Sequence, residues 1–292
     1  MNPCLICHEP QLKVFYEGPV RTGSFGKQSN FHATITECPR CGARHLPPMV
    51  ADLAAYYQSG EYRNDLEQGN AVEKYFELTD DDQPHKLELL GMHEARGRMV
   101  ADIGCGAGPF LDLVKGFAAG TIGVEPNAAY HESLRQRGHT CYPYARDALA
   151  EWQGKVDLAV SFSVLEHVEK PREFLAEIKA LLKPGGRLLI STPNADDFLL
   201  EICPAYAPFF YRKAHLWYFT ERALRELAIR AGFGECRVVH RHRYDLANAL
   251  LWLRDRRPTG LGALKLDARL EAAWKSGLEA AGRGDYLYAF LS

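Results

Sequence analysis

Apolar and polar stretches alternate regularly in the middle of the chain and predict strands and helices that follow one another. Residues 99–115 read as a short apolar run that ends at Asp102, three glycines, and an amphipathic stretch that begins at Phe110. This pattern predicts a strand, a tight turn and a helix, because glycine lets the backbone turn sharply and approach a ligand closely. The helix would present unpaired backbone N–H groups at the same turn.

The pattern continues along the chain. Further strands are predicted in TIGVEPN, which contains Glu125, in CYPYARDAL, which contains Asp147, in VDLAVSFSVLEHV, and after a helix and a Pro-Gly-Gly turn in GGRLLISTPN. Strands that alternate with helices indicate a parallel sheet that binds ligands at the carboxyl ends of its strands. We therefore expect an α/β, Rossmann-like doubly wound fold, in which YLYAFLS pairs antiparallel with GECRVVHRH.

Four cysteines near the N-terminus have the spacing of metal ligands. Cys4 and Cys7 form one C-x-x-C pair, and Cys38 and Cys41 form another. Two such pairs close a tetrahedral site that suits Zn²⁺, and four thiolates leave no open position, which indicates a structural role. The segments LKVFYEG and NFHATITE predict a β-hairpin between the pairs, so the module is zinc-ribbon-like. Redox dithiols are the alternative interpretation.

The organisation predicted from these patterns has three parts. A zinc-binding module is followed by a helical, tyrosine-rich lead-in, in which Tyr56, Tyr57 and Tyr62 either point into a site or pack the helices. A large α/β domain completes the chain and contains two amphipathic helices before its last strand. The boundaries are 1–48 for the module, 49–97 for the lead-in, 98–292 for the domain and about 243–284 for the helical insertion.

The composition and the N-terminal sequence bear on the class of protein and on its cellular compartment. The chain has 292 residues, of which 47% are hydrophobic and 25% charged, and a formal net charge of −2. This balance is that of a globular protein and makes nucleic-acid binding an unexpected property. The N-terminus has no signal-like segment, and no apolar run reaches the length of a membrane span. We therefore expect a cytoplasmic protein.

The segments DIGCGAG, VEPN, VLEHV and LLKPGGRLLISTPN together resemble the class I S-adenosylmethionine-dependent methyltransferases, over roughly residues 98–236. The resemblance implies S-adenosylmethionine as the cofactor and a lead-in that covers it. Dehydrogenases share the glycine turn and the acidic residue after the next strand, and they are the alternative. The VLEHV and LLKPGGRL segments argue against them by resemblance.

The expected cofactor-binding residues lie at the ends of the predicted strands. Asp102 would meet the ammonium of the methionine moiety, Glu125 the ribose diol, and Asp147 the exocyclic amine of adenine. The glycines would let the backbone pass close to the cofactor, and Ser163 lies in the SFSV segment after the fourth strand. The complete set is Asp102, Gly104, Gly106, Glu125, Asp147 and Ser163.

The segment YRKAHLWYFT looks like the histidine-centred segment of sugar C-methyltransferases, which also carry an N-terminal cysteine-rich zinc module. The resemblance makes His215 the general base and Tyr218 the aromatic residue after it. Ala214 stands where that family has an acidic residue, and its second C-terminal domain is missing, so O-methylation fits as well as C-methylation. A structural cap is the other interpretation of His215.

Two neighbouring residues complete the candidate chemistry. His167 in LEHV is a second candidate base, or a histidine that is hydrogen-bonded to nearby backbone. Glu166 corresponds to a metal ligand of some related O-methyltransferases, but no partner carboxylate is evident, and no catalytic metal is expected.

We therefore expect methyl transfer to a small polar acceptor, a sugar or glycan. The alternative is a methyltransferase that acts on protein or RNA, with the zinc module as a docking element, and a third possibility is a binding protein without turnover. The segment SFSV replaces the (N/D)PP(Y/F) motif of amino-group methyltransferases. A basic cluster at Arg254, Arg256 and Arg257 could bind a phosphorylated partner, but it also fits a solvated helix end.

Overall fold

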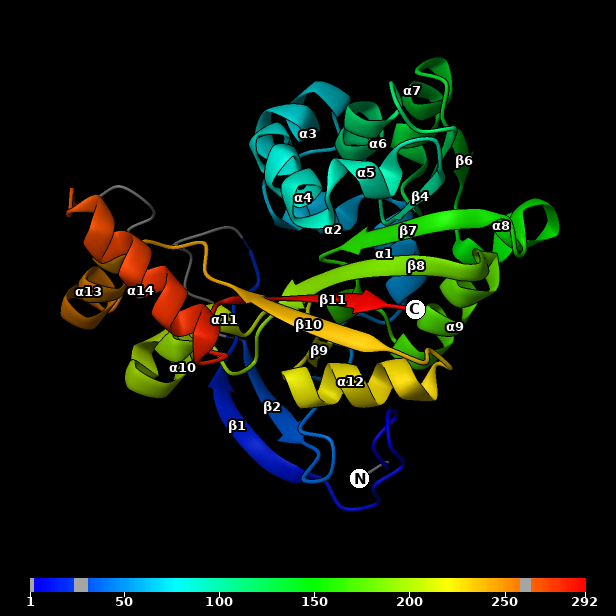
Figure 1. Cartoon of the computed structure of the whole chain (residues 1–292). Coiled ribbons are helices and arrows are strands. Elements are labelled where there is room, and N and C mark those ends of the chain that lie inside the picture. The colour runs from blue at the N-terminus through cyan, green and yellow to red at the C-terminus, as the bar shows by residue number, and fades with distance from the viewer. Residues whose placement is uncertain (1–2, 24–30, 258–263) are drawn as a thin grey trace.

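A seven-stranded sheet forms the centre of the molecule (Figure 1). The computed structural model describes residues 3–23, 31–257 and 264–292. The strand order is β10-β11-β8-β7-β4-β5-β6; β11 is antiparallel to both of its neighbours and the other pairs are parallel. The bounds are β4 (Met99–Ile103), β5 (Gly120–Val124), β6 (Thr140–Tyr142), β7 (Val156–Phe162), β8 (Leu182–Pro193), β10 (Cys236–Arg241) and β11 (Tyr286–Leu291).

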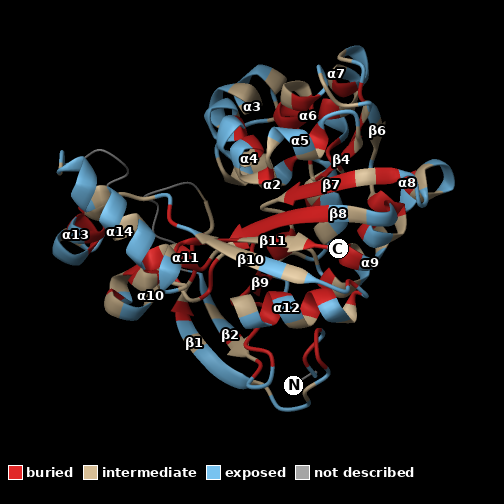
Figure 2. Cartoon of the chain, viewed as in Figure 1, coloured by how far each residue is buried: buried red, intermediate tan, exposed pale blue. Residues whose placement is uncertain are grey.

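Alternate residues of the central strands enter two different cores, as the twofold repeat of a strand requires. Val100 and Leu158 pack with α4 (Gln83–Leu90) and α6 (Pro109–Val114). Their neighbours Ala101 and Ala159 pack on the other face with α9 (Pro171–Leu181) and α12 (Glu221–Arg230). Figure 2 shows β7 and β8 buried over most of their length. The predicted Rossmann-like fold is confirmed.

A second, four-stranded sheet joins the N-terminal module to the α/β domain. Its order is β1-β2-β3-β9, all antiparallel. The predicted hairpin is formed by β1 (Lys13–Pro19) and β2 (His32–Glu37), and β3 (Arg44–His45) pairs with β9 (Trp217–Tyr218). Because β9 lies within the segment YRKAHLWYFT, two residues after His215, this short strand pair connects the cysteine module to the candidate site.

The predicted Pro-Gly-Gly turn is a bulge within β8, since Val156 pairs with Leu182 but Leu158 already pairs with Arg187. The segment CYPYARDAL is only partly a strand, because α8 begins at Ala145. The lead-in contains α1 (Leu53–Gln58), α2 (Glu61–Asp65), α3 (Val72–Thr79), η1 (Asp80–Asp82) and α5 (Met92–Ala95). The domain adds η2 (Ala128–Tyr130), α7 (His131–Gln136), α8 (Ala145–Trp152), η3 (Leu165–His167), α10 (Phe198–Ile202), η4 (Pro204–Tyr206), α11 (Ala207–Phe210), α13 (Leu246–Asp255) and α14 (Ala268–Ala280).

Candidate active site

The glycine turn after β4 lies at the carboxyl edge of the sheet, where the strand order reverses. Gly104 and Gly106 have φ angles of +82° and +54°. A Cβ at Gly104 would overlap the Val164 side chain, and a Cβ at Gly106 would overlap the ring of Tyr75. Both positions therefore require glycine, for conformation and for space.

Glu125, the residue directly after β5, holds this turn in place. Its Oε2 accepts a hydrogen bond from the Gly106 N–H at 2.8 Å, and its Oε1 accepts one from the Asn127 N–H at 2.8 Å. Burial raises the pKa of Glu125, while the two N–H donors and the charge of Arg63 oppose the shift. Each carboxylate oxygen keeps a second lone pair, so the predicted contact with a ribose diol remains chemically open.

Replacing Glu125 tests this role. We expect Glu125→Ala to weaken binding of S-adenosylhomocysteine by at least about 1.4 kcal/mol, a tenfold effect, because both the turn and the ribose lose their acceptor. The protein should remain folded. Glu125→Gln keeps one acceptor oxygen and should lose less affinity. Calorimetric titration measures both variants, and an unchanged affinity in Glu125→Ala would contradict the assignment.

Asp102 and Lys86 form a pair of opposite charges beside the turn. Burial raises the pKa of Asp102 to about 7, and the nearby charge of Lys86 opposes this shift. Burial lowers the pKa of Lys86, and Asp102 opposes that shift in turn. A zwitterionic amino-acid moiety needs one group of each charge. The sequence analysis missed Lys86, because a lysine on an amphipathic helix has no distinguishing pattern.

The lead-in covers the glycine turn, as the resemblance implied. The Tyr75 hydroxyl of α3 lies against Gly106, and the guanidinium of Arg63 lies 4.2 Å from the centroid of the Tyr75 ring. Asn70 Oδ1 accepts a hydrogen bond from Asn127 Nδ2 at 2.9 Å. These contacts join the lead-in to the glycine turn after β4 and to the segment after β5.

The three tyrosines singled out in the lead-in have three different roles. Tyr62 lines a cavity at the candidate site. The Tyr57 hydroxyl lies 3.0 Å from His167 Nδ1. Tyr56 donates to the carboxylate of Asp65 at 2.8 Å and therefore stabilises the lead-in itself.

Two of the expected cofactor-binding residues, Asp147 and Ser163, have no hydrogen bond to the turn held by Glu125 among the described residues. Asp147 is exposed in the first turn of α8, and its charge acts on Glu177 of α9. The strand before it ends at Tyr142, so the helix begins earlier than expected, and the structure gives the adenine role no support. Ser163 has φ +56° and shares a hydrogen bond of 2.7 Å with the Tyr286 hydroxyl, in the cavity described next.

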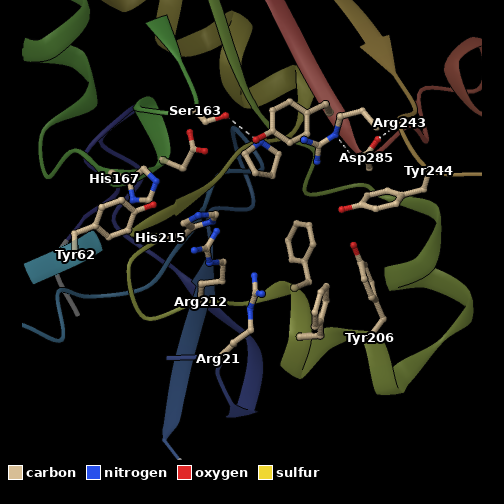
Figure 3. A pocket seen from close by; sticks show the side chains of 15 residues that line it. Arg21, Tyr62, Ser163, His167, Tyr206, Arg212, His215, Arg243, Tyr244 and Asp285 are labelled. Carbon is tan, nitrogen blue, oxygen red and sulfur yellow. Dashed lines mark hydrogen bonds and ion pairs between the residues drawn. The ribbon is translucent and has the colours of Figure 1, made fainter. Parts of the chain in front are cut away.

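A cavity of about 230 Å³ lies at the carboxyl ends of β7 and β8 (Figure 3). Ser163 and Glu166 enter it from the segment after β7, and His215 enters it from the loop before β9. Aromatic side chains of α11 and β11 form part of its wall. Reactive groups from several segments therefore meet next to the glycine turn, where an acceptor would lie.

His215 is 4% exposed, and its Nδ1 has no hydrogen-bond partner among the residues that the structure describes. Its ring is perpendicular to that of His167, with 4.7 Å between the centroids. Burial and the charge of Arg212 hold the pKa of His215 well below its usual value of 6.5. The imidazole is therefore neutral at neutral pH and offers a nitrogen lone pair to the cavity.

His167 has a more structural environment. Its Nδ1 lies 2.8 Å from the carbonyl oxygen of Ala214, which only accepts hydrogen bonds, so Nδ1 carries the proton. Burial lowers the pKa of His167 to about 3. The hydrogen bond fixes the residue before His215, which agrees with the backbone-bonded interpretation, and it leaves Nε2 of His167 as the unprotonated nitrogen.

The expectation that Tyr218 takes part in catalysis is not supported. Tyr218 is fully buried in β9, and its hydroxyl accepts from the Arg212 N–H at 2.8 Å and donates to the Arg212 carbonyl at 3.1 Å. Because both bonds are to one backbone residue, Tyr218 holds the loop that carries Arg212 and His215.

Glu166 lies next to His215 and is 1% exposed. Its Oε2 has no hydrogen-bond partner within the described ranges, and burial raises its pKa to about 7. Glu166, His167 and His215 each place a potential ligand atom within 4.8 Å of the others. The positive charge of Arg212 acts on all three side chains. That charge opposes a divalent cation, so we continue to expect no catalytic metal.

The raised pKa of Glu166 should make the protein less stable as the pH rises. The unfolded side chain ionises near 4.5 and the folded one near 7, so between these values the folded state binds the extra proton. The stabilisation that this proton gives to the folded state is complete below pH 4.5 and is lost as the pH rises through 7. Glu166→Gln should therefore raise the unfolding free energy at pH 8 by up to about 3 kcal/mol, and by less at pH 5. Denaturant titrations at both pH values measure this. Exposed Glu88→Gln is the control, and an equal effect at both pH values would contradict the explanation.

The four cysteines of the module form one buried cluster. The Sγ atoms of Cys4 and Cys41 lie 3.7 Å apart, and those of Cys7 and Cys38 lie 3.4 Å apart. All four are free thiols. A tetrahedral zinc with bonds of 2.3 Å would separate its sulfurs by about 3.8 Å, so the donor set and its spacing fit Zn²⁺. The ring of the neighbouring His45 packs on the Trp217 ring, with 4.4 Å between the centroids.

Arginines line the cavity, and the sequence analysis did not single them out. They are Arg21, Arg212 and Arg243. Arg243 forms an ion pair with Asp285 at 2.7 Å and lies over the Tyr286 ring. The cluster predicted at Arg254 to Arg257 lies at the exposed end of α13, where Arg254 pairs with Asp255, as expected for a solvated helix end.

Comparison with known proteins agrees with this geometry. A family model described as "Methyltransferase domain" matches residues 77–235, which is more than half of the 292 residues. The chain belongs to this methyltransferase family. The match includes the glycine turn, Glu125 and Glu166 but neither the cysteine module nor α13 and α14.

Curated relatives of this methyltransferase act on different acceptors. A tRNA U34 carboxymethyltransferase of Azotobacter vinelandii is 31% identical over 165 residues, which are 53% of this chain and 51% of the relative. A ubiquinone biosynthesis O-methyltransferase of Bradyrhizobium sp. is 32% identical over 116 residues, 37% of this chain and 46% of the relative. The chain spans about half the length of the curated relatives it matches.

A solved structure gives the same fold. An S-adenosylmethionine-dependent methyltransferase of Archaeoglobus fulgidus superposes with a TM-score of 0.52 at 17% identity, and the match covers 75% of this chain and 96% of that one. The prediction of a methyltransferase is thus confirmed by family and by fold. None of the described helices is both long and apolar enough to cross a lipid bilayer.

Proposed function

We propose that this methyltransferase transfers a methyl group from S-adenosylmethionine to a hydroxyl group or an acidic carbon of a small polar acceptor, a sugar or glycan. His215 is the general base. The observation that carries the proposal is the buried imidazole of His215, which lines the cavity and whose Nδ1 has no hydrogen-bond partner within the described part of the chain.

The chain's residues fit the cofactor at the glycine turn. Glu125 fixes the Gly106 N–H and has acceptor capacity for the ribose diol, and Asp102 and Lys86 match the charges of the amino-acid moiety. When bound, S-adenosylmethionine supplies a methyl group that its sulfonium already activates. The protein then has to align the acceptor, exclude water and remove a proton.

For a hydroxyl acceptor, the unprotonated ring nitrogen of His215 would take the hydroxyl proton as the acceptor oxygen forms its bond to the methyl carbon. The bond between that carbon and sulfur breaks, and its electron pair stays on sulfur. His215 is already neutral, so it can accept this proton without first losing one. Tyr218 and His167 hold the backbone on either side of it.

The acceptor is proposed from the resemblance to sugar methyltransferases and from the cavity. A volume of about 230 Å³ is below that of usual pockets for drug-sized ligands, so the group that enters is small. The name of the ubiquinone relative supports oxygen as the methylated atom. The name of the tRNA relative supports the second candidate, an RNA acceptor with the zinc module as a docking element.

The cysteine cluster is proposed to bind structural Zn²⁺ in a module that spans residues 1–48, before the lead-in at 49–97 and the α/β domain at 98–292. Four thiolates would fill the tetrahedral site, so the metal would have no open position for chemistry. The eight free cysteines support a reducing compartment, and we place the protein in the cytoplasm.

Transfer of radiolabelled methyl groups tests the function. The full chain is incubated with labelled S-adenosylmethionine and, separately, with monosaccharides, nucleotide sugars, glycan extracts and tRNA. We expect label in a sugar-containing product. If label enters only tRNA or protein, the alternative function replaces the proposal. If the wild-type protein does not bind S-adenosylhomocysteine, the cofactor assignment is wrong.

A further inference from the structure

Two arginines from distant parts of the chain meet at the candidate site. Arg21 follows β1, and Arg212 lies between α11 and β9. Their backbones are joined, since the Arg21 N–H donates to the Tyr211 carbonyl at 2.9 Å and the Lys213 N–H donates to the Arg21 carbonyl at 2.8 Å. Figure 3 shows both side chains pointing into the space that His215 also faces.

The two arginines also line a second cavity. It measures about 220 Å³ and shares Arg21, Tyr62 and Arg212 with the first cavity. The first cavity contains the candidate base. The second is lined from the lead-in by residues such as Arg63 and Gln68. The arginines therefore lie between the cavity that contains His215 and a second cavity that could hold another part of the acceptor.

The charge of Arg212 is not matched by an acid among the described residues. Arg212 has no ion pair or side-chain hydrogen bond among the residues that the structure describes, whereas Arg243 in the same cavity is paired with Asp285. The charge of Arg212 lowers the pKa of Arg21, after burial, and also those of His167 and His215. Two carboxyls line the cavity: Asp285 is paired with Arg243, and burial raises the pKa of Glu166 to about 7.

Arg21 is buried and Arg212 is half-buried, and the charge of Arg212 acts on Arg21. An anion that binds both guanidiniums relieves the repulsion between these like charges. A guanidinium donates in a planar fork that matches the oxygens of a phosphate, and two guanidiniums match its double charge. The Tyr62 hydroxyl, at the junction of the cavities, is a further possible donor.

We propose that Arg21 and Arg212 bind a phosphate group of the methyl acceptor, so that the acceptor is a phosphate ester held between the two cavities. The inference rests on the proposed function, because it requires the acceptor to occupy the cavity that contains His215. It also gives the N-terminal part of the chain a role in substrate binding, through Arg21. An anion at this position would offset the charges that lower the basicity of His215, so the acceptor itself would help to activate the base.

Calorimetric titration tests the proposal on the full chain saturated with S-adenosylhomocysteine. The probes are glucose 1-phosphate, inorganic phosphate, glucose and glucuronate. We expect both phosphates to bind, and Arg212→Gln and Arg21→Gln to weaken that binding at least tenfold. Arg212→Lys, which keeps the charge but loses the fork, should weaken it less. Exposed Arg254→Gln is the control and should change nothing.

The outcomes separate this inference from the function itself. S-adenosylhomocysteine affinity should be the same in all variants, which shows that they are folded. Phosphate binding that is absent, or that does not depend on either arginine, overturns the proposal, and so does tighter binding of glucuronate than of glucose 1-phosphate. Failure of the proposed function would appear elsewhere, as turnover that survives His215→Ala.

Discussion

His215→Ala is expected to lower the kcat of methyl transfer by about 10²–10⁴-fold, the usual contribution of general acid–base catalysis. The affinity for S-adenosylhomocysteine should stay the same. The two results separate because His215 lies in the cavity with Glu166 and Ser163, whereas the residues that fit the cofactor surround Gly106. The measurement combines initial rates at saturating acceptor with calorimetry of the binary complex.

A matched variant distinguishes a base from a packing residue. His215→Asn keeps a polar side chain but has no basic nitrogen, so it should be as inactive as the alanine variant. The control is His45→Asn, because His45 packs on Trp217 in the adjoining strand pair and its loss would disturb the same region without removing a base. Turnover within a few-fold of wild type in His215→Ala would exclude His215 as the base and leave Glu166 as the candidate.

Local motifs made the glycine turn and Glu125 predictable, since each is fixed by neighbours within one strand, turn and helix. Asp147 shows the limit of that reasoning, because the strand before it ends three residues before Ala145, where α8 begins, so Asp147 lies within a helix and not directly after a strand. His215 was found only through a resemblance, since a lone histidine in an aromatic loop has no periodic pattern.

Long-range contacts account for the residues that the sequence did not indicate. Arg21 and Arg212 are brought together by backbone hydrogen bonds between segments far apart in the chain, which no local pattern encodes. The pairing of β3 with β9 is equally hidden, because strands of two residues are too short to show alternation. Lys86 and Arg63 became recognisable only once the lead-in was seen to cover the turn.

Removing the metal from the cysteine cluster should lower turnover much more than cofactor binding. The buried apolar residues of the module, such as Ile6 and Ile35, pack in clusters that it shares with the rest of the chain. Structural zinc contributes about 10–16 kcal/mol of apparent binding free energy in model fingers. In the intact protein β3 holds β9 through the pairing of Arg44 with Tyr218, and the Leu46 N–H donates to the Leu216 carbonyl at 2.8 Å. Without the metal, we expect these contacts to be lost. The loop that carries His215 would then shift, and a displacement of about 1 Å can cost about 10²-fold in rate.

The test compares Cys38→Ser with Cys236→Ser, a cysteine of β10 outside the cluster. Zinc content is measured by mass spectrometry, together with turnover and S-adenosylhomocysteine affinity. We expect Cys38→Ser to lose the metal and about 10²-fold in turnover, with a much smaller change in affinity, because no residue of the module contacts the glycine turn in the described structure. A zinc-free protein with full turnover would show that the cluster does not position the site. Equal losses of turnover and affinity would show that the module instead stabilises the whole domain. This is the relevant alternative, because Cys4 and Cys41 pack in one core with Trp217 and Leu224.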